Sequence, residues 1–289
     1  MHRSSLCLSV CFLVGMTGAC SGEAQVTRAE TATAHYLANE GVMVVRGETK
    51  VVFDPLFENS YGQYHLPPAD MREALFAGTP PYDGVDMIFV SHFHGDHFSP
   101  ADILALMKAH TNLKLAAPLQ AVSAMRDVAT TQDEPVFDRI TSVNLQYGEK
   151  PVSHEISGIK IDAVRIPHAG WPTGRLDVEN IAWRVTLADD ITVLHMGDAD
   201  PRDLHFAQDA DYWAAREINM AFPPYWYFLA EGGREVLEDR LKPYHSVGTH
   251  VPEAMPDDPA SRPAEYQGYD LFTEPGETRD ISTHRSTER

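Results

Sequence analysis

The chain's densest group of chemically reactive side chains lies in the segment Ser91-His92-Phe93-His94-Gly95-Asp96-His97. Imidazole and carboxylate groups are ligands of borderline metal ions such as zinc, and here four of them fall within six positions. Gly95 permits a tight turn between them. A chance histidine-rich surface stretch is a weaker interpretation, because apolar sequence bounds the segment. We therefore predict a metal site that contains His92, His94, Asp96 and His97.

The neighbouring sequence places this segment at the end of a strand. Residues 87–90 form an unbroken apolar run, which is typical of a buried strand. A helix is predicted after the segment, with Ser99 as its N-cap, Pro100 at its first position and an apolar face over residues 103–107. In a loop that leaves a buried strand, four polar side chains can converge without distorting a helix.

The rest of the chain alternates predicted strands and helices, a pattern that favours sheets with helices packed against them. The first half contains a hairpin at 42–53, a long loop at 57–85 with a short helix near 69–76, a strand at 113–117 and a helix at 119–128. The second half contains strands at 159–164, 181–187, 191–195 and 246–251 and a short helix at 233–241.

Composition limits the possible partners. The chain has 289 residues, of which 43% are hydrophobic, enough for a substantial core. Its 42 acidic residues against 23 Lys and Arg give a formal charge of −19. Such a surface repels phosphate backbones, so we expect a small-molecule substrate and no nucleic-acid partner. Oligomeric state stays open.

The N-terminus has the pattern of an export signal. A positive start, an apolar stretch from Leu6 to Met16 and small residues before Cys20 predict a signal peptide over residues 1–19. The run that ends at Cys20 resembles a bacterial lipoprotein processing site, although Thr17 departs from its usual aliphatic residue. We expect an exported protein, either soluble in the periplasm or anchored to the membrane by a lipid at Cys20.

The segments after the signal divide by composition. Residues 20–33 read as a polar tether, residues 34–255 as the folded domain that contains the metal site, and residues 256–289 as a loosely ordered acidic tail. All three cysteines lie within the first 20 residues, so the mature chain has no disulfide framework and its stability must come from its core.

The segment from Ser91 to His97 resembles the signature of the metallo-β-lactamase superfamily, and within it the zinc hydrolases related to ascorbate-6-phosphate lactonase. The resemblance covers about residues 35 to 252 and implies a four-layer αββα sandwich with the site at one edge, between the sheets. It also implies further ligands after later strands, for which His168, Asp198 and His250 are the matching positions. Asp200 and His245 are the weaker alternatives to the last two.

This resemblance implies two metal positions. His92, His94 and His168 would hold the first, and Asp96, His97 and His250 the second, with Asp198 bridging both. His and carboxylate ligands favour two Zn²⁺ per chain, although Mn²⁺ or Fe would also fit. Asp54 and His195 match family positions that would support the ligands, but a turn residue and a core histidine are alternative interpretations. Trp171 and the aromatic residues at 225–227 are candidates for the lining of the substrate mouth, with packing in the core as the alternative interpretation.

The implied activity is hydrolysis. Hydroxide generated between two metals would attack a small ester, lactone or phosphodiester, with Asp96 orienting the water and receiving its proton. A mononuclear iron enzyme resembling persulfide dioxygenases is one alternative, and a cell-envelope binding protein with a structural metal is another. Loops near 57–82, 169–178 and 222–232 would shape the substrate pocket, and the sequence does not identify the substrate.

Overall fold

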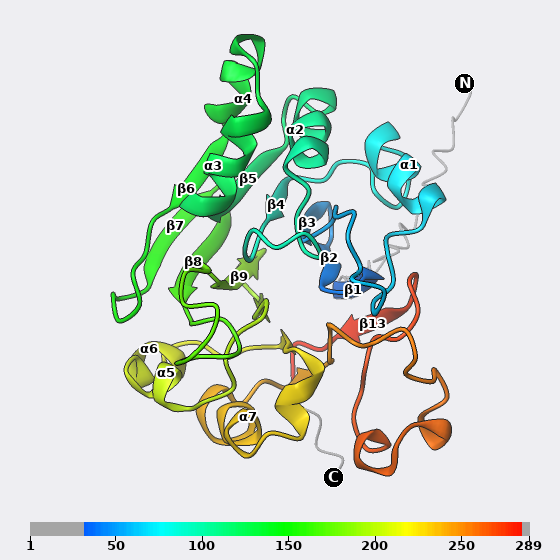
Figure 1. Ribbon diagram of the computed structural model, residues 1–289, viewed down its shortest axis with the longest axis vertical. Coiled ribbons are helices and arrows are strands. Elements are labelled where there is room, and N and C mark those ends of the chain that lie inside the picture. Colours follow the sequence, from blue (N-terminus) through cyan, green and yellow to red (C-terminus); the bar gives the residue numbers. More distant parts are fainter. Residues whose placement is uncertain (1–31, 285–289) are drawn as a thin grey trace, which may run out of the picture. The chain divides into compact units, whose positions relative to one another are not determined.

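The computed structural model describes residues 32–284, whose strands form two sheets (Figure 1). The first sheet contains β1 (Ala32–Ala38), β2 (Gly41–Arg46), β3 (Thr49–Phe53), β4 (Met87–Phe89), β5 (Lys114–Pro118), β6 (Ile140–Val143) and β13 (Thr278–Ile281). Their spatial order is β13-β1-β2-β3-β4-β5-β6. Strands β3 to β6 are mutually parallel, so their carboxyl ends meet at one edge.

The second sheet has six strands, in the order β12-β11-β10-β9-β8-β7. They are β7 (Val152–Ile156), β8 (Ile159–Arg165), β9 (Ile181–Leu187), β10 (Ile191–His195), β11 (Met220–Phe222) and β12 (His245–Ser246). Strands β7 to β10 pair antiparallel, whereas β10, β11 and β12 run parallel. The carboxyl ends of β10 and β11 therefore also lie together.

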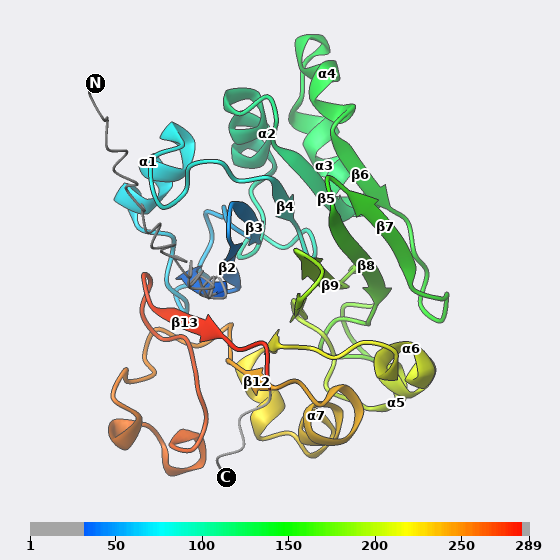
Figure 2. The ribbon, with the colours of Figure 1, turned by 180° about the vertical axis from the view of Figure 1, so that it is seen from behind.

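Helices cover the outer face of each sheet (Figures 1 and 2). The first sheet carries α1 (Ala69–Ala77), α2 (Pro100–Ala109), α3 (Leu119–Val128) and α4 (Glu134–Phe137). The second carries α5 (Leu204–Ala207), α6 (Ala210–Ala214), α7 (Glu231–Glu235) and a π-helix at Val236–Leu241. Short 3₁₀ turns occur at 131–133, 225–228, 259–261 and 264–266. The order helix, sheet, sheet, helix confirms the predicted αββα sandwich.

The core between the sheets follows from strand periodicity. In β2, Val42 and Val44 join the cluster between the two sheets, whereas Met43 points to the other side and joins the cluster under the helices. Because both faces of the sheet are buried, β2 reads as a continuous apolar run rather than as an alternation. The inner cluster contains the fully buried Phe53, Phe89 and Trp183.

Most predicted elements occur where the sequence placed them. The structure has α3, β9 and β10 with the predicted bounds, and Ser99 accepts a hydrogen bond from the Asp102 backbone N–H at the start of α2. The predicted strand at 246–251 is wrong in extent. Only β12 is a strand in this segment. Gly248 and Thr249 make isolated bridges to two different segments, at Leu271 and Pro224, so neither bridge extends the strand.

The prediction of a loosely ordered tail is wrong. Within residues 256–284, β13 pairs antiparallel with β1, and Leu271, Phe272 and Ile281 are buried. Phe272 stacks on Tyr36 with the ring centroids 4.8 Å apart. These few apolar side chains fix the segment against the sheet, although its composition is dominated by Pro, Asp and Glu.

The N-terminal predictions fall largely outside the described residues. The signal peptide, the lipid anchor at Cys20 and most of the tether precede residue 32. The predicted tether ends too late, since β1 already begins at Ala32. Along residues 32–284, no helix combines the length and apolar character needed to cross a membrane.

Candidate metal centre

The predicted ligands come from loops that leave strands at one edge of the sandwich. The loop after β4 carries the segment from His92 to His97, the loop after β8 carries His168, and the loop after β10 carries Asp198. His250 follows β12 in the second sheet. The carboxyl ends of strands from both sheets thus bring residues more than 150 positions apart to one place.

The first ligand group consists of His92, His94, His168 and Asp198, whose ligand atoms lie within 4.8 Å of one another. His94 Nδ1 is 3.0 Å from His92 Nε2 and 3.2 Å from His168 Nε2. His168 Nε2 is 3.0 Å from Asp198 Oδ2. Three imidazole nitrogens and one carboxylate oxygen therefore surround a single point, as a zinc ion requires.

The second group consists of Asp96, His97 and His250. His250 Nε2 is 3.4 Å from Asp96 Oδ2, and His97 Nε2 is 3.8 Å from the same oxygen. The other oxygen of the Asp198 carboxylate, Oδ1, lies 3.5 Å from His97 Nε2 and 3.2 Å from His250 Nε2. Asp198 thus directs one oxygen to each group, which is the geometry of a bridging carboxylate.

The chemistry of these atoms fits divalent cations. Among the described residues, the buried atoms His97 Nε2, His250 Nε2 and Asp198 Oδ1 have no hydrogen-bond partner. Buried polar atoms are normally satisfied, so these atoms require another partner. A cation between them would supply it.

The protonation states point the same way. Burial holds the pKa of His92 well below its ordinary range and lowers that of His94 to about 4, so both imidazoles are neutral. Burial opposes ionisation of Asp198, but the charges of His250 and His97 outweigh it and keep the pKa of Asp198 well below its ordinary value. His92 and His94 therefore offer neutral nitrogens and Asp198 an anionic oxygen, the forms that bind metals. Burial opposes protonation of His97 and His250, but Asp198 and Asp96 raise the pKa of both, so a cation at the second group would displace their protons.

A layer of hydrogen bonds behind the ligands sets the orientation of their rings. Asp54 accepts hydrogen bonds from the Ser91 backbone N–H at 2.7 Å and the Ser91 hydroxyl at 2.5 Å, and its Oδ2 lies 3.0 Å from His97 Nδ1. Since the Ser91 hydroxyl donates to Asp54, it accepts from His92 Nδ1 at 3.0 Å. Both histidines then carry their ring proton on Nδ1, and Nε2 is left to bind a cation. Asp54 lies where the sequence predicted a supporting residue.

The turn that bears Asp198 depends on Gly197. Its φ is 52°, and a Cβ there would lie 2.5 Å from Asn180 Oδ1 and 2.6 Å from Ser91 Cβ. Asn180 Oδ1 accepts a hydrogen bond from the Asp198 backbone N–H at 3.0 Å. Only glycine leaves room for this close approach.

The turn between β1 and β2 also holds the site, and sequence reasoning missed it. The Asn39 amide donates to the Asp96 carbonyl at 2.8 Å, and the Asn39 carbonyl accepts from the His250 backbone N–H at 3.0 Å. Glu40 accepts from the Thr249 hydroxyl at 2.9 Å. Nothing in the local sequence marks these residues, because their partners His250 and Thr249 lie more than 200 positions away.

His195 belongs to this supporting layer rather than to either ligand group. It is fully buried, stacks on Phe53 with ring centroids 4.9 Å apart, and its Nε2 lies 2.8 Å from the Glu40 carbonyl oxygen. Glu40, Asp54 and His195 form a third buried cluster. Thus His195 is both a core histidine and a link between β10 and the Asn39–Glu40 turn.

The weaker ligand alternatives lie elsewhere. His245 is half exposed and pairs with Asp270 at 2.7 Å, and Asp200 is engaged by His205 and Arg202. Of the aromatic residues proposed for the mouth, Trp226 lines the pocket, with its ring 5.3 Å from that of His250. Tyr227 is buried in the core, which is the alternative interpretation of these aromatic residues.

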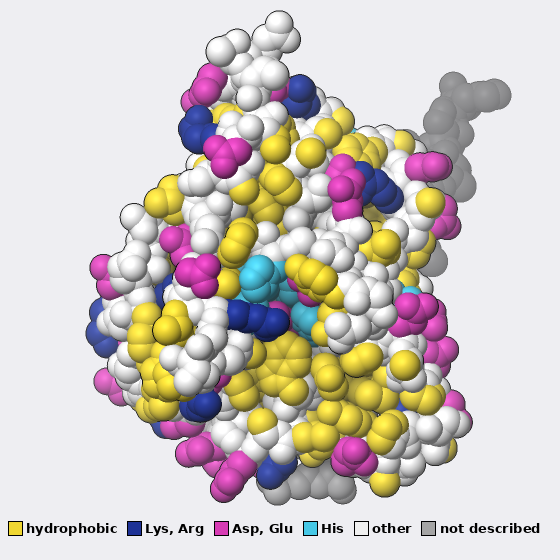
Figure 3. Space-filling model, viewed as in Figure 1, with side chains coloured by type: hydrophobic (Ala, Val, Ile, Leu, Met, Phe, Trp, Pro, Cys, Tyr) yellow, Lys and Arg dark blue, Asp and Glu magenta, His cyan; other side chains and the backbone are white. Residues whose placement is uncertain are grey.

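The ligand groups open into a cavity of about 470 Å³. Figure 3 shows the histidines at the bottom of a hollow, with a basic side chain across its opening and apolar side chains below. The lining residues come from the predicted substrate loops and the ligand groups: Tyr61, Gln63, Tyr64, His94, Asp96, Arg175, Asp198, Trp226 and His250.

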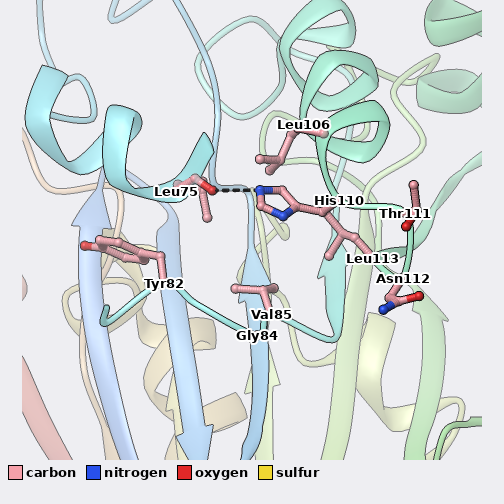
Figure 4. A pocket seen from close by; sticks show the side chains of 10 residues that line it. Leu75, Tyr82, Gly84, Val85, Leu106, His110, Thr111, Asn112 and Leu113 are labelled. Carbon is pink, nitrogen blue, oxygen red and sulfur yellow. Dashed lines mark hydrogen bonds between the residues drawn. The ribbon is translucent and has the colours of Figure 1, made fainter. Parts of the chain in front are cut away.

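A second cavity, of about 290 Å³, lies between α1 and α2 (Figure 4). His110 lines it and donates through Nε2 to the carbonyls of Leu75 and Phe76, 3.2 and 3.0 Å away. These carbonyls belong to the last turn of α1, and that of Leu75 also accepts from the Gly78 backbone N–H at 3.3 Å. His110 therefore adds a side-chain cap to the end of α1.

Fold and site together define the class of protein. A model of the beta-lactamase superfamily domain matches residues 49–215, which is more than half of the chain. The chain therefore belongs to the beta-lactamase superfamily. The matched region contains β3 and every predicted ligand except His250.

Among sequence relatives, the UPF0173 metal-dependent hydrolase of Pyrococcus horikoshii is 26% identical over 210 residues, which cover 71% of this chain and 79% of the relative. The corresponding protein of Pyrococcus furiosus is 23% identical over 213 residues, with the same coverages.

Solved structures agree with the fold. The metallo-beta-lactamase fold protein YhfI from Bacillus subtilis is 15% identical with a TM-score of 0.55, covering 87% of this chain and 99% of that protein. Igni18, a metallo hydrolase from Ignicoccus hospitalis, is 16% identical with a TM-score of 0.56 and the same coverages. The two sheets and their flanking helices are thus those of the metallo-β-lactamase fold.

Proposed function

We propose that this protein is a metal-dependent hydrolase that holds two divalent cations, with Zn²⁺ the expected metal. His92, His94 and His168 would hold the first cation, Asp96, His97 and His250 the second, and Asp198 both. The observation that carries this proposal is the Asp198 carboxylate, whose Oδ2 is 3.0 Å from His168 and whose Oδ1 is 3.2 Å from His250. A carboxylate that directs one oxygen to each ligand group favours two ions over one.

Bound cations would supply a water of lowered pKa as the nucleophile and Lewis acidity toward the scissile group. Asp96 lines the pocket, and its Oδ2 lies 3.4 Å from His250 Nε2. In that place its carboxylate can orient the attacking water and receive its proton. Asp54 and Ser91 keep His97 and His92 in the tautomers that the site needs.

For the substrate, we propose a small ester, lactone or phosphodiester. A cavity of about 470 Å³ suits a small molecule, and it opens directly onto the ligand groups. The sequence resemblance to the ascorbate-6-phosphate lactonase group makes lactones the first compounds to test. The open cavity also speaks against a purely structural metal, since structural sites are closed by four protein ligands.

The iron-dependent persulfide dioxygenase alternative uses one metal. The second group, Asp96, His97 and His250, is complete and buried, and Asp198 reaches it with a separate oxygen. This completeness favours two metal positions.

The test is metal content by elemental analysis of the purified protein and of His94→Ala and His250→Ala, followed by a screen of lactones, esters and phosphodiesters. We expect about two zinc ions per chain in the wild type and fewer in each variant. Hydrolysis should disappear with chelation and return with zinc. One iron per chain would redirect the assays to oxygen consumption with a persulfide, and a metal-free protein after zinc supplementation would contradict the proposal.

A further inference from the structure

Arg175 is the basic residue of the active-site cavity. Among the described residues that line the cavity, it alone is a Lys or Arg. It lies in the loop between β8 and β9, and Figure 3 shows a basic side chain across the opening beside the histidines. Its side chain is exposed, so a ligand can reach it from the cavity.

The Arg175 guanidinium has no partner within residues 32–284. No hydrogen bond or ion pair of its side chain occurs there, whereas other arginines pair with carboxylates, as Arg240 does with Asp203 and Arg279 with Asp270. Since the chain carries 42 Asp and Glu, an arginine left unpaired beside a cavity is unusual. Its five donors in a planar fork suit a carboxylate or phosphate.

The backbone fixes the place of Arg175. Its φ is 55°, in the left-handed region that non-glycine residues rarely adopt, and its carbonyl accepts from the Val178 backbone N–H at 3.2 Å. The buried Arg165 holds the end of the same loop by donating to the Val178 carbonyl at 2.6 Å and the Asn180 carbonyl at 3.1 Å. The loop is therefore anchored where it presents Arg175, and strained residues of this kind cluster at binding sites.

The charge of the cavity selects the class of ligand. Asp96 and Asp198 also line it, so with Arg175 alone the cavity is slightly negative. Two divalent cations would make it strongly positive, and Arg175 would add to that potential rather than neutralise it. Tyr61, which is 55% exposed, and Trp226 offer aromatic surface in the same cavity.

We propose that Arg175 binds an oxyanion, either a carboxylate or a phosphate, carried by the substrate, while the scissile bond lies over the ligand groups. This proposal rests on the proposed hydrolase function and narrows its substrates to anionic esters and lactones. Arg175 is thus a specificity-determining residue.

The test is calorimetric binding of three amides that carry no ester bond: 3-acetamidobenzoate, 3-acetamidophenylphosphonate and the neutral 3-acetamidobenzamide. The proteins are the zinc-loaded wild type, Arg175→Gln, Arg175→Lys and the control Arg126→Gln. Arg126 is an exposed arginine on α3 that pairs with Glu134. The measured quantity is the ratio of affinities for the charged and neutral amides, and the carboxylate and phosphonate arms distinguish the two oxyanions.

We expect Arg175→Gln to reduce this ratio by about tenfold relative to the wild type for at least one anion. Arg175→Lys should retain part of the preference, and Arg126→Gln should retain all of it. Because the metals also attract anions, the contribution of Arg175 is the decrease in this affinity ratio from the wild type to Arg175→Gln. An unchanged ratio in Arg175→Gln, or an equal loss in Arg126→Gln, would overturn the proposal. If the affinity ratio fell in Arg175→Gln as expected but no compound in any screen were hydrolysed, the proposed hydrolase function would be contradicted and the oxyanion site would stand.

Discussion

At the scale of single residues, the site depends on which ring nitrogen of each ligand histidine carries the proton. Each ligand histidine must present a lone pair, and in His92, His97 and His168 a hydrogen-bond acceptor behind the ring sets which nitrogen keeps its proton. Asp54 places the ring proton of His97 on Nδ1 by a direct hydrogen bond, and that of His92 through Ser91. His168 donates through Nδ1 to the Ala169 carbonyl at 2.8 Å. The supporting layer therefore controls metal affinity without touching the metal.

Asp54→Asn tests this control. The new amide N–H₂ would face the His97 Nδ1–H, so the ring would move its proton to Nε2 and lose the lone pair directed at the second position. We expect zinc affinity at that position to fall by about 10–100-fold with the fold intact. Zinc titration against a competing chelator measures it. Asp200→Asn is the matched control, a buried aspartate two positions from Asp198 that binds His205 and Arg202 instead. Equal losses in both variants would refute the argument.

The same scale shows what sequence can predict. His92 to His97, His168 and Asp198 each directly follow a strand, so local pattern and family resemblance together place them. The structure also brings His250 rather than His245 into the ligand groups, which the sequence could only favour. Arg175 escaped notice because an arginine in a loop is ordinary in sequence, and its significance lies in the absence of a partner among residues 32–284.

At the scale of elements, the β1–β2 turn acts as a clamp on the second ligand group, Asp96, His97 and His250. Asn39 joins the loop of Asp96 to the loop of His250, and Glu40 adds Thr249 and His195. Asn39 has a φ of 47°, which asparagine tolerates better than most residues. The turn lies before the region that the family model matches, so this chain completes its site with an element outside that region.

Two substitutions separate the roles of Asn39. Asn39→Gly removes the amide but accepts the positive φ, and we expect it to weaken the second zinc about fivefold, the equivalent of one hydrogen bond of about 1 kcal/mol. Asn39→Ala should do the same and also lower the free energy of unfolding by about 1 kcal/mol from backbone strain. Zinc titration and urea unfolding measure the two effects. If Asn39→Gly bound two zinc ions as tightly as the wild type, the clamp would have no role in metal binding.

Elements also show where prediction from sequence fails. Strand β13 has the sequence Thr278-Arg279-Asp280-Ile281, which has little of the apolar character of a strand. It is stabilised by pairing with β1 and by Arg279, which binds Asp270 at 2.9 Å. The pairing with β1 joins segments more than 200 positions apart, so composition alone suggested a loose tail.

At the scale of the whole molecule, charge separates surface from site. Acidic side chains are scattered over the visible face, while histidines and a basic side chain occupy the hollow (Figure 3). A field of this kind repels polyanions at large but favours a small anion at the cavity itself. The expectation of no nucleic-acid partner is consistent with this pattern and stays a prediction.

We propose that the first 20 residues direct export and that Cys20 determines whether the protein is anchored. With a lipid at Cys20, we expect the protein at a membrane surface, where its substrate must reach it; without the lipid, we expect it in the periplasm. We expect metabolic labelling with a radioactive fatty acid to label the wild type, and Cys20→Ser to abolish the label and release the protein from the membrane fraction. Cys11→Ser is the matched control, because Cys11 lies within the apolar stretch of the signal and should not alter labelling. A mature wild-type protein without label would exclude the anchor, and a tether beginning at residue 20 would then be a free N-terminus.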